Sequence, residues 1–399
     1  MFFATRRPLV FLSLIMALSA GSLSAEPEYP NLFTEHLGVT PQAVEEKIYA
    51  AWQQLFYGDD ETQRIYYPVG DDMAYITDVA NNDVRSEGMS YGMMIAVQLD
   101  KQEEFNRIWK WAQTYMFHHE GKMKGYSAWH CDFEGNKLSN GTASDGEEWY
   151  EMALYFASAR WGDGEGIFNY RQQADTLLDD MMNRDDGEGY HVSIFNREEK
   201  QVVFVPHGQF AGFTDPSYHL PAYYELWAKW APEHNDFWKE CAMVSREFFR
   251  KTAHPETGLM PDYANFDGTP RLDSPHKDFL FDAWRTLANV ALDWSWNQAD
   301  PWQVEQSNRV LTFLSQYGDH PPANLTLDGT PLIEAKGPGL VAMSAVAGLA
   351  ADPEIARPFV KNLWEMEIPE GRYRYYDGML YMLGLLQAGG HFRIYDPTE

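Results

Sequence analysis

Carboxylic acids recur along this chain at the predicted starts of apolar helices, namely Glu87, Asp145, Asp282 and Asp377, with Asp215 before a further helix. One such residue is more typical of helix capping, because its carboxylate accepts hydrogen bonds from free N–H groups and opposes the helix dipole. Several carboxylates at one rim would place like charges close together. This lowers the stability of the fold, but it shifts pKa values in a way that is useful for acid–base chemistry. We therefore interpret them as candidates for a general acid and a general base.

Two carboxyl groups that act as general acid and general base must be in opposite protonation states. A helix N-terminus stabilises the ionised form, so Glu87 can act as an acid only if burial or a neighbouring carboxylate raises its pKa. Asp145 is the natural candidate for that neighbour. Asp282 would then be the base, and Arg285, one turn later, could orient Asp282 and keep it charged or form an ordinary helix ion pair.

The elements that must position these residues are mainly helices. Ser86 as an N-cap, and the capping-box spacing of Asp145 and Glu148, predict two of the helix starts. Segments of amphipathic helical period cover 44–56, 104–117, 170–182, 221–231, 235–251 and 302–317, and segments apolar nearly all round cover 86–99, 147–160, 282–296, 339–350 and 377–388. The best strand signal, 201–205, is short.

Apolar helices alternate with amphipathic ones along the chain. This pattern predicts an all-α fold in which inner helices are buried on all sides and outer helices have one wet face. A ring of helical hairpins fits the alternation. In such a ring the inner helices run parallel, so their N-termini, and the acidic residues there, share one rim.

The N-terminus predicts a secretory signal peptide over residues 1–25. Arg6 and Arg7 precede the apolar stretch 8–18, which is too short to span a bilayer, and small residues at 23–25 offer a cleavage site. A retained anchor is the alternative. We expect an exported protein, periplasmic or extracellular, because no later stretch is apolar enough to cross a membrane.

Residues 26–399 contain no Ser/Gly tract, Pro-rich run or block of like charge, which predicts a single catalytic domain. The formal net charge of -28 argues against nucleic acid and anionic membranes as partners, whereas a neutral polysaccharide is compatible with it. No zinc-type spacing, phosphate loop or G-x-S-x-G elbow is present, so we expect no metal or cofactor. We also expect the protein to be a monomer. Whether Cys131 and Cys241 pair stays open.

Five motifs give the chain a family likeness. They cover residues 83–93, 144–149, 214–221, 281–285 and 374–378. With them the chain resembles glycoside hydrolase family 8 from about residue 29 to 395. The resemblance implies an (α/α)6 barrel and an inverting mechanism, with Glu87 as general acid and Asp282 as general base. It implies that Asp145 binds the sugar at the cleavage point and favours its distortion.

The resemblance also implies substrate-binding residues. Tyr218 matches a residue near the catalytic water, and Trp129 matches a stacking platform. The resemblance also places three aromatic residues in the substrate cleft, Phe281, Tyr376 and Tyr381, for which core packing is the alternative. Arg285 completes the predicted set.

Within the family, residues 67–72, 254–259 and 266–270 resemble reducing-end xylose-releasing exo-oligoxylanases. This implies release of xylose from the reducing end of β-1,4-linked xylo-oligosaccharides in xylan breakdown. Those enzymes carry a Leu-His-Pro kink that blocks the cleft, whereas here Glu334–Pro338 lacks that tripeptide. An endo-1,4-β-xylanase with an open cleft is the alternative; further alternatives are a β-glucanase or chitosanase and a non-catalytic sugar-binding protein.

Overall fold

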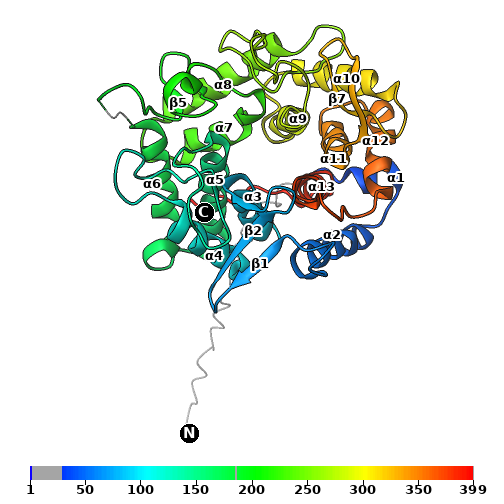
Figure 1. The fold of residues 1–399 in the computed structure, drawn as a ribbon. Coiled ribbons are helices and arrows are strands. Elements are labelled where there is room, and N and C mark those ends of the chain that lie inside the picture. Colours follow the sequence, from blue (N-terminus) through cyan, green and yellow to red (C-terminus); the bar gives the residue numbers. More distant parts are fainter. Residues whose placement is uncertain (2–28, 185–186, 399) are drawn as a thin grey trace.

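The computed structural model describes Met1 and residues 29–184 and 187–398. Apart from Met1, the predicted signal peptide lies outside the described residues. Twelve helices of the described part form two concentric layers around one axis (Figure 1). A short helix, α1 (Leu32–Leu37), packs against the outer layer at α12. This double ring confirms the predicted (α/α)6 barrel.

The two layers alternate along the chain. The inner layer consists of α3 (Ser86–Gln98), α5 (Ser144–Trp161), α7 (Pro221–Trp230), α9 (Trp284–Asn297), α11 (Pro338–Val346) and α13 (Arg374–Ala388). The outer layer consists of α2 (Pro41–Tyr57), α4 (Gln102–Trp111), α6 (Tyr170–Met182), α8 (Asn235–Thr252), α10 (Trp302–Ser315) and α12 (Pro353–Glu365).

Burial explains why the sequence distinguishes the layers. Every residue of α3 except Glu87 is buried, because this helix has neighbours on all sides. The outer helix α4 instead buries one stripe, which includes Phe105, Ile108 and Trp109. The apolar and amphipathic patterns therefore predict inner and outer positions correctly for most helices.

The prediction for 221–231 is wrong, because α7 belongs to the inner layer. Its polar residues gave an amphipathic pattern, but Glu225 forms an ion pair with Arg246 of α8 at 2.7 Å. Tyr223, Tyr224 and Trp227 bury the remaining sides. The pattern did not reveal α12, which contains Pro358 in its interior.

Short strands connect the helices at one end of the barrel. Strands β1 (Tyr66–Val69), β2 (Met73–Asp78), β3 (Asp83–Arg85) and β4 (His130–Cys131) form an antiparallel sheet. Two further pairs are β5 (Phe195–Asn196) with β6 (Gln201–Val202), and β7 (Pro322–Leu325) with β8 (Pro331–Lys336). The strand predicted over 201–205 is thus only two residues long.

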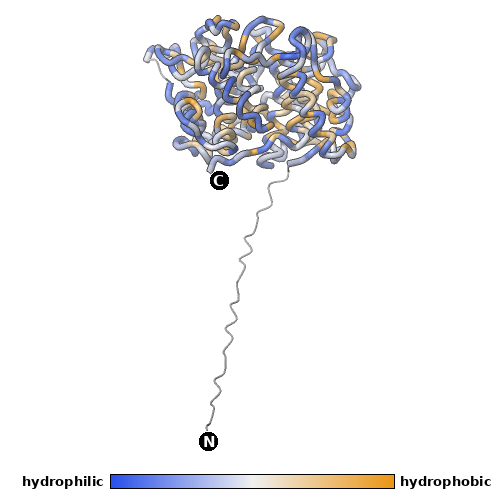
Figure 2. The backbone as a smooth tube through the Cα atoms, turned by 90° about the horizontal axis from the view of Figure 1, so that it is seen from below, coloured by the Kyte–Doolittle hydropathy of each residue, from blue (hydrophilic) through white to orange (hydrophobic). Residues whose placement is uncertain are grey.

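The C-terminal segment crosses the opposite end of the barrel. The Arg393 N–H donates to the side chain of Gln98, at the end of α3, and the Phe392 ring stacks on Trp296, at the end of α9, with centroids 5.7 Å apart. The Arg160 guanidinium, at the end of α5, lies 4.7 Å from the centroid of the Tyr395 ring. In side view the C-terminus lies at the edge of the molecule (Figure 2).

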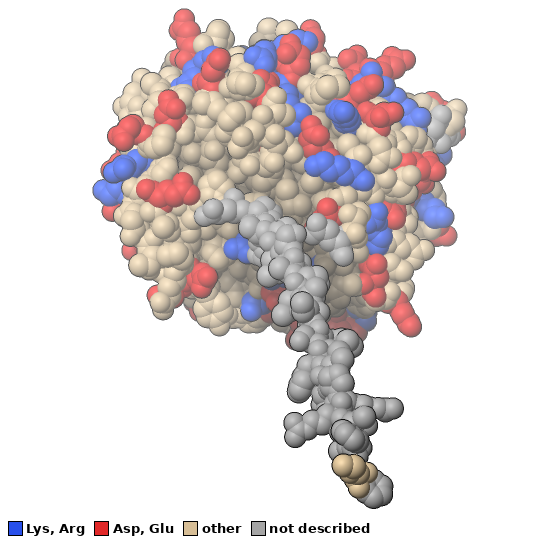
Figure 3. Space-filling view, turned by 180° about the vertical axis from the view of Figure 1, so that it is seen from behind, with Lys and Arg blue, Asp and Glu red and all other residues tan. Residues whose placement is uncertain are grey.

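The outer surface mixes both signs of charge. Around the edge of the face seen from behind, Asp and Glu side chains are interspersed with Lys and Arg (Figure 3). Within the described residues, no helix is both long and apolar enough to traverse a bilayer. Cys131 and Cys241 are buried and do not form a disulfide.

Candidate active site

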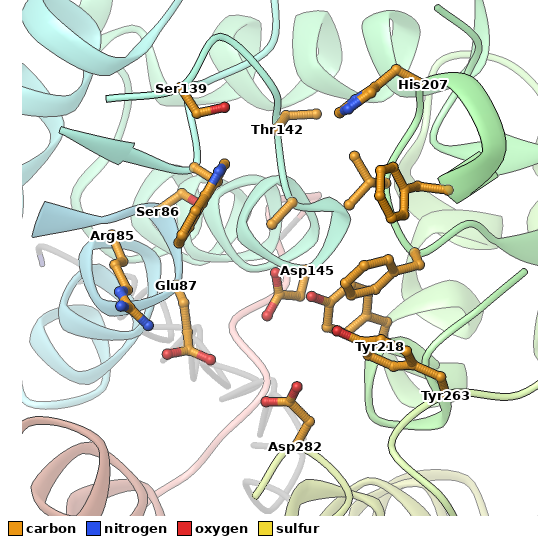
Figure 4. Close-up of a pocket in the computed structure, with 15 residues that line it drawn as sticks. Arg85, Ser86, Glu87, Ser139, Thr142, Asp145, His207, Tyr218, Tyr263 and Asp282 are labelled. Carbon is orange, nitrogen blue, oxygen red and sulfur yellow. The ribbon is translucent and has the colours of Figure 1, made fainter. Parts of the chain in front are cut away.

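Three of the predicted acidic residues converge at the rim where the inner helices begin. Glu87 lies in the first turn of α3, Asp145 in the first turn of α5, and Asp282 in the turn that precedes α9. Their carboxyl groups face a common space (Figure 4). The helix predicted to open at Asp282 instead begins at Trp284, so Asp282 belongs to an irregular turn.

The predicted capping roles are wrong. Ser86 is the first helical residue rather than the N-cap, and its N–H donates to the Trp129 carbonyl at 3.0 Å. The N-cap of α5 has no capping side chain. Glu148 instead accepts a hydrogen bond from the Tyr224 hydroxyl at 2.6 Å. These polar groups serve tertiary contacts, and the contact between Ser86 and Trp129 fixes the start of α3.

Arg285 lies at the centre of the carboxyl groups. Its Nη1 donates to Glu87 Oε2 at 3.0 Å and to Asp145 Oδ2 at 2.9 Å, while its Nη2 donates to Asp282 Oδ1 at 3.2 Å. Nη1 also donates to the Tyr91 hydroxyl at 2.7 Å. Arg285 is therefore more than the predicted partner of Asp282, since one buried cation donates hydrogen bonds to three carboxyl groups and compensates negative charge among them.

The environment of Glu87 favours its protonated form near neutral pH. Burial raises the pKa of Glu87 to about 7; Arg285 lowers it, and Asp145 and Asp282 raise it. The Tyr375 hydroxyl hydrogen-bonds Glu87 Oε1 at 3.0 Å. Burial is thus the largest cause, and the predicted contribution of Asp145 adds to it.

Asp145 is more enclosed than Glu87. Burial raises its pKa, while Arg285 opposes that shift through charge and a hydrogen bond. Asp145 Oδ1 also accepts the N–H of Gly146 at 2.9 Å. A carboxyl group fixed in this way is suited to holding a sugar hydroxyl rather than to exchanging protons with solvent.

Two cavities meet at these residues, and Glu87, Asp282 and Arg85 line both. One, here named the Trp129 pocket, has a volume of about 430 Å³ and is also lined by Trp129, Asp145, Phe204, His207, Tyr218 and Tyr263. The other, named the Tyr376 pocket, has a volume of about 590 Å³ and is also lined by Phe281, Trp284, Ile333, Lys336, Tyr373 and Tyr376. Together they form a cleft with the candidate acid and base at its middle.

Most predicted substrate-binding residues lie in this cleft. Trp129 and Tyr218 line the Trp129 pocket, and Phe281 and Tyr376 line the Tyr376 pocket. The Tyr376 hydroxyl donates to the Phe281 carbonyl at 2.9 Å, which joins α13 to the turn that carries Asp282. Phe281 is 47 % exposed, so its ring is available to a ligand.

Tyr381 is the exception. Its side chain is fully buried, and its hydroxyl donates to the Met366 carbonyl at 3.3 Å. Lys47, from the outer helix α2, lies 5.7 Å from the centroid of its ring. Tyr381 therefore packs between the two layers and lines neither pocket.

The sequence reasoning gave no individual role to three residues near the acid and the base. Tyr375 contacts Glu87, although the motif pointed to its neighbour Tyr376. Asp215 is fully buried, and burial, with Asp282 as the next cause, raises its pKa. Asp262 contacts the turn that carries Asp282. Asp215 was noted as a helix-start acid, whereas Asp262 had no periodic signal to mark it.

The site combines a carboxyl group protonated near neutral pH with a second carboxyl group beside a fixed cation. These are the requirements for general acid and general base action on a bond held between them. No cluster of three or more His, Cys, Asp or Glu side chains in the described ranges is arranged to hold a metal ion. Arg285 supplies a positive charge that contacts all three carboxyl groups.

Known proteins share both the sequence and this architecture. The model of glycosyl hydrolases family 8 matches residues 75–390. The reducing-end xylose-releasing exo-oligoxylanase Rex8A of Paenibacillus barcinonensis is 47% identical over 92% of this chain and 97% of its own, and its xylose complex superposes with a TM-score of 0.88. A similar enzyme of Halalkalibacterium halodurans is 42% identical over 93% of this chain and 95% of its own.

A third relative has been solved with a bound sugar. The xylobiose complex of a glycoside hydrolase family 8 protein from Teredinibacter turnerae is 45% identical, covers 92% of this chain and 98% of its own, and has a TM-score of 0.89. The family model spans most of the sequence, including every residue of the acid–base site. This chain therefore belongs to glycosyl hydrolases family 8.

Proposed function

We propose that this protein hydrolyses β-1,4-xylosidic bonds of xylo-oligosaccharides with inversion, and that it releases xylose from the reducing end. The arrangement of Glu87 and Asp282 on two nitrogens of Arg285, between two sugar-sized pockets, carries the proposal. The exo-oligoxylanases that match most of the chain support this substrate and this direction of action.

The proposed reaction needs one proton donor and one proton acceptor. Glu87 donates its proton to the glycosidic oxygen as the bond to the anomeric carbon breaks. Asp282 accepts a proton from a water molecule whose oxygen attacks that carbon from the opposite face. Asp145 binds the sugar at the cleavage point, and Arg285 orients Asp282 by donating to its Oδ1.

Endo action is a second candidate because of one feature of the Tyr376 pocket. Ile333, Ala335 and Lys336 of β8 line this pocket, and all six residues of β8 are exposed. The segment Glu334–Pro338 carries no Leu-His-Pro tripeptide to block the cleft. An unblocked pocket of about 590 Å³ would admit more than one sugar beyond the cleaved bond.

The products from xylohexaose labelled at its reducing end distinguish the two candidates. Reducing-end exo action is expected to give labelled xylose and unlabelled xylopentaose at the earliest times. Labelled xylobiose and xylotriose would instead mean endo action. Carboxymethylcellulose and chitosan serve as controls, and faster cleavage of either would contradict the proposed substrate class.

We further propose that the protein is exported by the signal peptide at residues 1–25 and acts as a monomer without nucleic-acid or membrane partners. The net charge of -28 supports the last point, and the cleft is complete within one chain. N-terminal sequencing of the protein from periplasm and medium should start near Glu26, and sedimentation should give a monomer mass. An intact Met1 on the cell-associated protein would contradict export with cleavage.

A further inference from the structure

The residue proposed as the base lies in a turn rather than in a helix, so something else must hold it. Asp282 precedes α9, and its own side chain is about one-third exposed, at 32 %. The N–H groups of Leu280 and Ala283, which flank Asp282, both donate to Oδ1 of Asp262, at 3.2 and 2.9 Å. One carboxylate oxygen of Asp262 thus binds the backbone on both sides of the proposed base.

Asp262 is itself held by His276. Its Oδ2 lies 3.1 Å from Nδ1 of His276, and its N–H donates to the Asp278 carbonyl at 3.0 Å. The N–H of Tyr263 donates to the His276 carbonyl at 2.8 Å, and the two rings stack with centroids 4.3 Å apart. The strand-like contacts and the ring stack leave Asp262 little freedom.

We propose that Asp262, held by His276, is a positioning residue that fixes the turn of residues 280–283 and thereby places the carboxylate of Asp282. This inference rests on the proposed role of Asp282 as the base. Tyr263, the next residue, lines the Trp129 pocket. The backbone at Asp262 therefore connects the turn of the proposed base to the lining of that pocket.

The electrostatics of Asp262 agree with a specific role. The side chain is almost completely buried, and burial raises its pKa to about 6; the hydrogen bond from His276 lowers it, and Asp282 raises it. The hydrogen bond to Asp262 in turn raises the pKa of His276. A buried acid beside another acid is unfavourable unless donors surround it, and here three hydrogen bonds do so.

The test compares Asp262→Ala with Asp262→Asn. In the alanine variant the turn loses its acceptor, and kcat on xylohexaose should fall about 10- to 100-fold while KM changes little, because small misplacements of a reacting group have effects of this size. In the asparagine variant Oδ1 can still accept both N–H groups, so most of kcat should return. Equal losses in the two variants, or a normal kcat in the alanine variant, would overturn the proposal.

Asp273→Ala is the matched control, because Asp273 belongs to the same irregular segment but is exposed and forms an ion pair with Arg271. Its kcat should equal that of the wild type. If Asp262→Ala does not fold, His276→Ala replaces it, since the His276 side chain is 41 % exposed. That variant should lose kcat several-fold at constant KM, and a normal kcat would refute the role of His276.

Hydrogen–deuterium exchange gives a readout that needs no substrate. The amides of Leu280 and Ala283 should exchange faster in Asp262→Ala than in the wild type. Unchanged exchange would contradict the proposal that Asp262 holds this turn. If the wild type did not cleave xylohexaose, the proposed function would be contradicted. The exchange experiment would still test whether Asp262 holds the turn of residues 280–283.

Discussion

Glu87→Gln is expected to lower kcat by roughly 10²- to 10⁴-fold while the affinity for xylo-oligosaccharides stays nearly constant. The amide matches the carboxyl group in size and can keep its oxygen toward Arg285 while its NH2 group faces the Tyr375 hydroxyl, but it cannot give a proton to the leaving oxygen. Initial rates on xylohexaose and calorimetric binding to the same variant measure the two quantities.

Glu103→Gln is the matched control, because Glu103 is exposed on α4 and forms an ion pair with Arg107 one turn later. Its rate should be unchanged. A near-normal rate in Glu87→Gln would contradict the assignment of the acid.

The same residue sets the pH dependence. Burial raises the pKa of Glu87 to about 7, so the acid is protonated below that pH and ionised above it. The wild-type kcat/KM should therefore fall as pH rises through about 7, and the fall should disappear from the residual rate of Glu87→Gln.

Asp282→Ala is the second substitution with a large expected effect. Without the carboxylate, no group accepts the proton of the attacking water, so turnover should be lost although Glu87 can still donate. Proton NMR of the wild-type reaction should show the α-anomer first from the β-linked substrate. Azide added to the variant should not yield a β-linked product.

A retained anomer in either experiment would mean a covalent intermediate and a different mechanism. Asp273→Ala, in the exposed loop before the base, again serves as the unaffected control.

The convergence of the carboxyl groups was predictable because it depends on helix order. Once apolar and amphipathic helices alternate, the inner helices run parallel and their starts share a rim. Glu87 and Asp145 were therefore placed together from their positions at helix starts alone. Asp282 was placed correctly near them although its helix begins two residues later.

Contacts that depend on helix rotation and on irregular segments were not predictable. Tyr375 and Tyr376 are neighbours in one motif, yet Tyr375 reaches Glu87 and Tyr376 reaches the Phe281 carbonyl. Tyr381, on the second turn of α13, faces the outer layer. Such differences are set by side-chain packing between layers, which the periodicity of one helix does not encode.

The short strands were missed for a similar reason. β3 and β4 have only three and two residues, and they pair across more than forty residues of sequence. Their own residues carry too few alternations to give a period. The pairing sets Trp129 beside the start of α3, so part of the cleft depends on contacts far apart in the chain.

The C-terminal segment across the far end of the barrel limits how a polymer can move through the enzyme. Phe392 lies among the inner helices with only 2 % of its surface exposed, and it contacts Trp149 and Trp296. The barrel is therefore closed at the end opposite the active site and is not a through-channel. A sugar chain has to enter and leave the cleft at the open end of the barrel, and it cannot pass along the barrel axis.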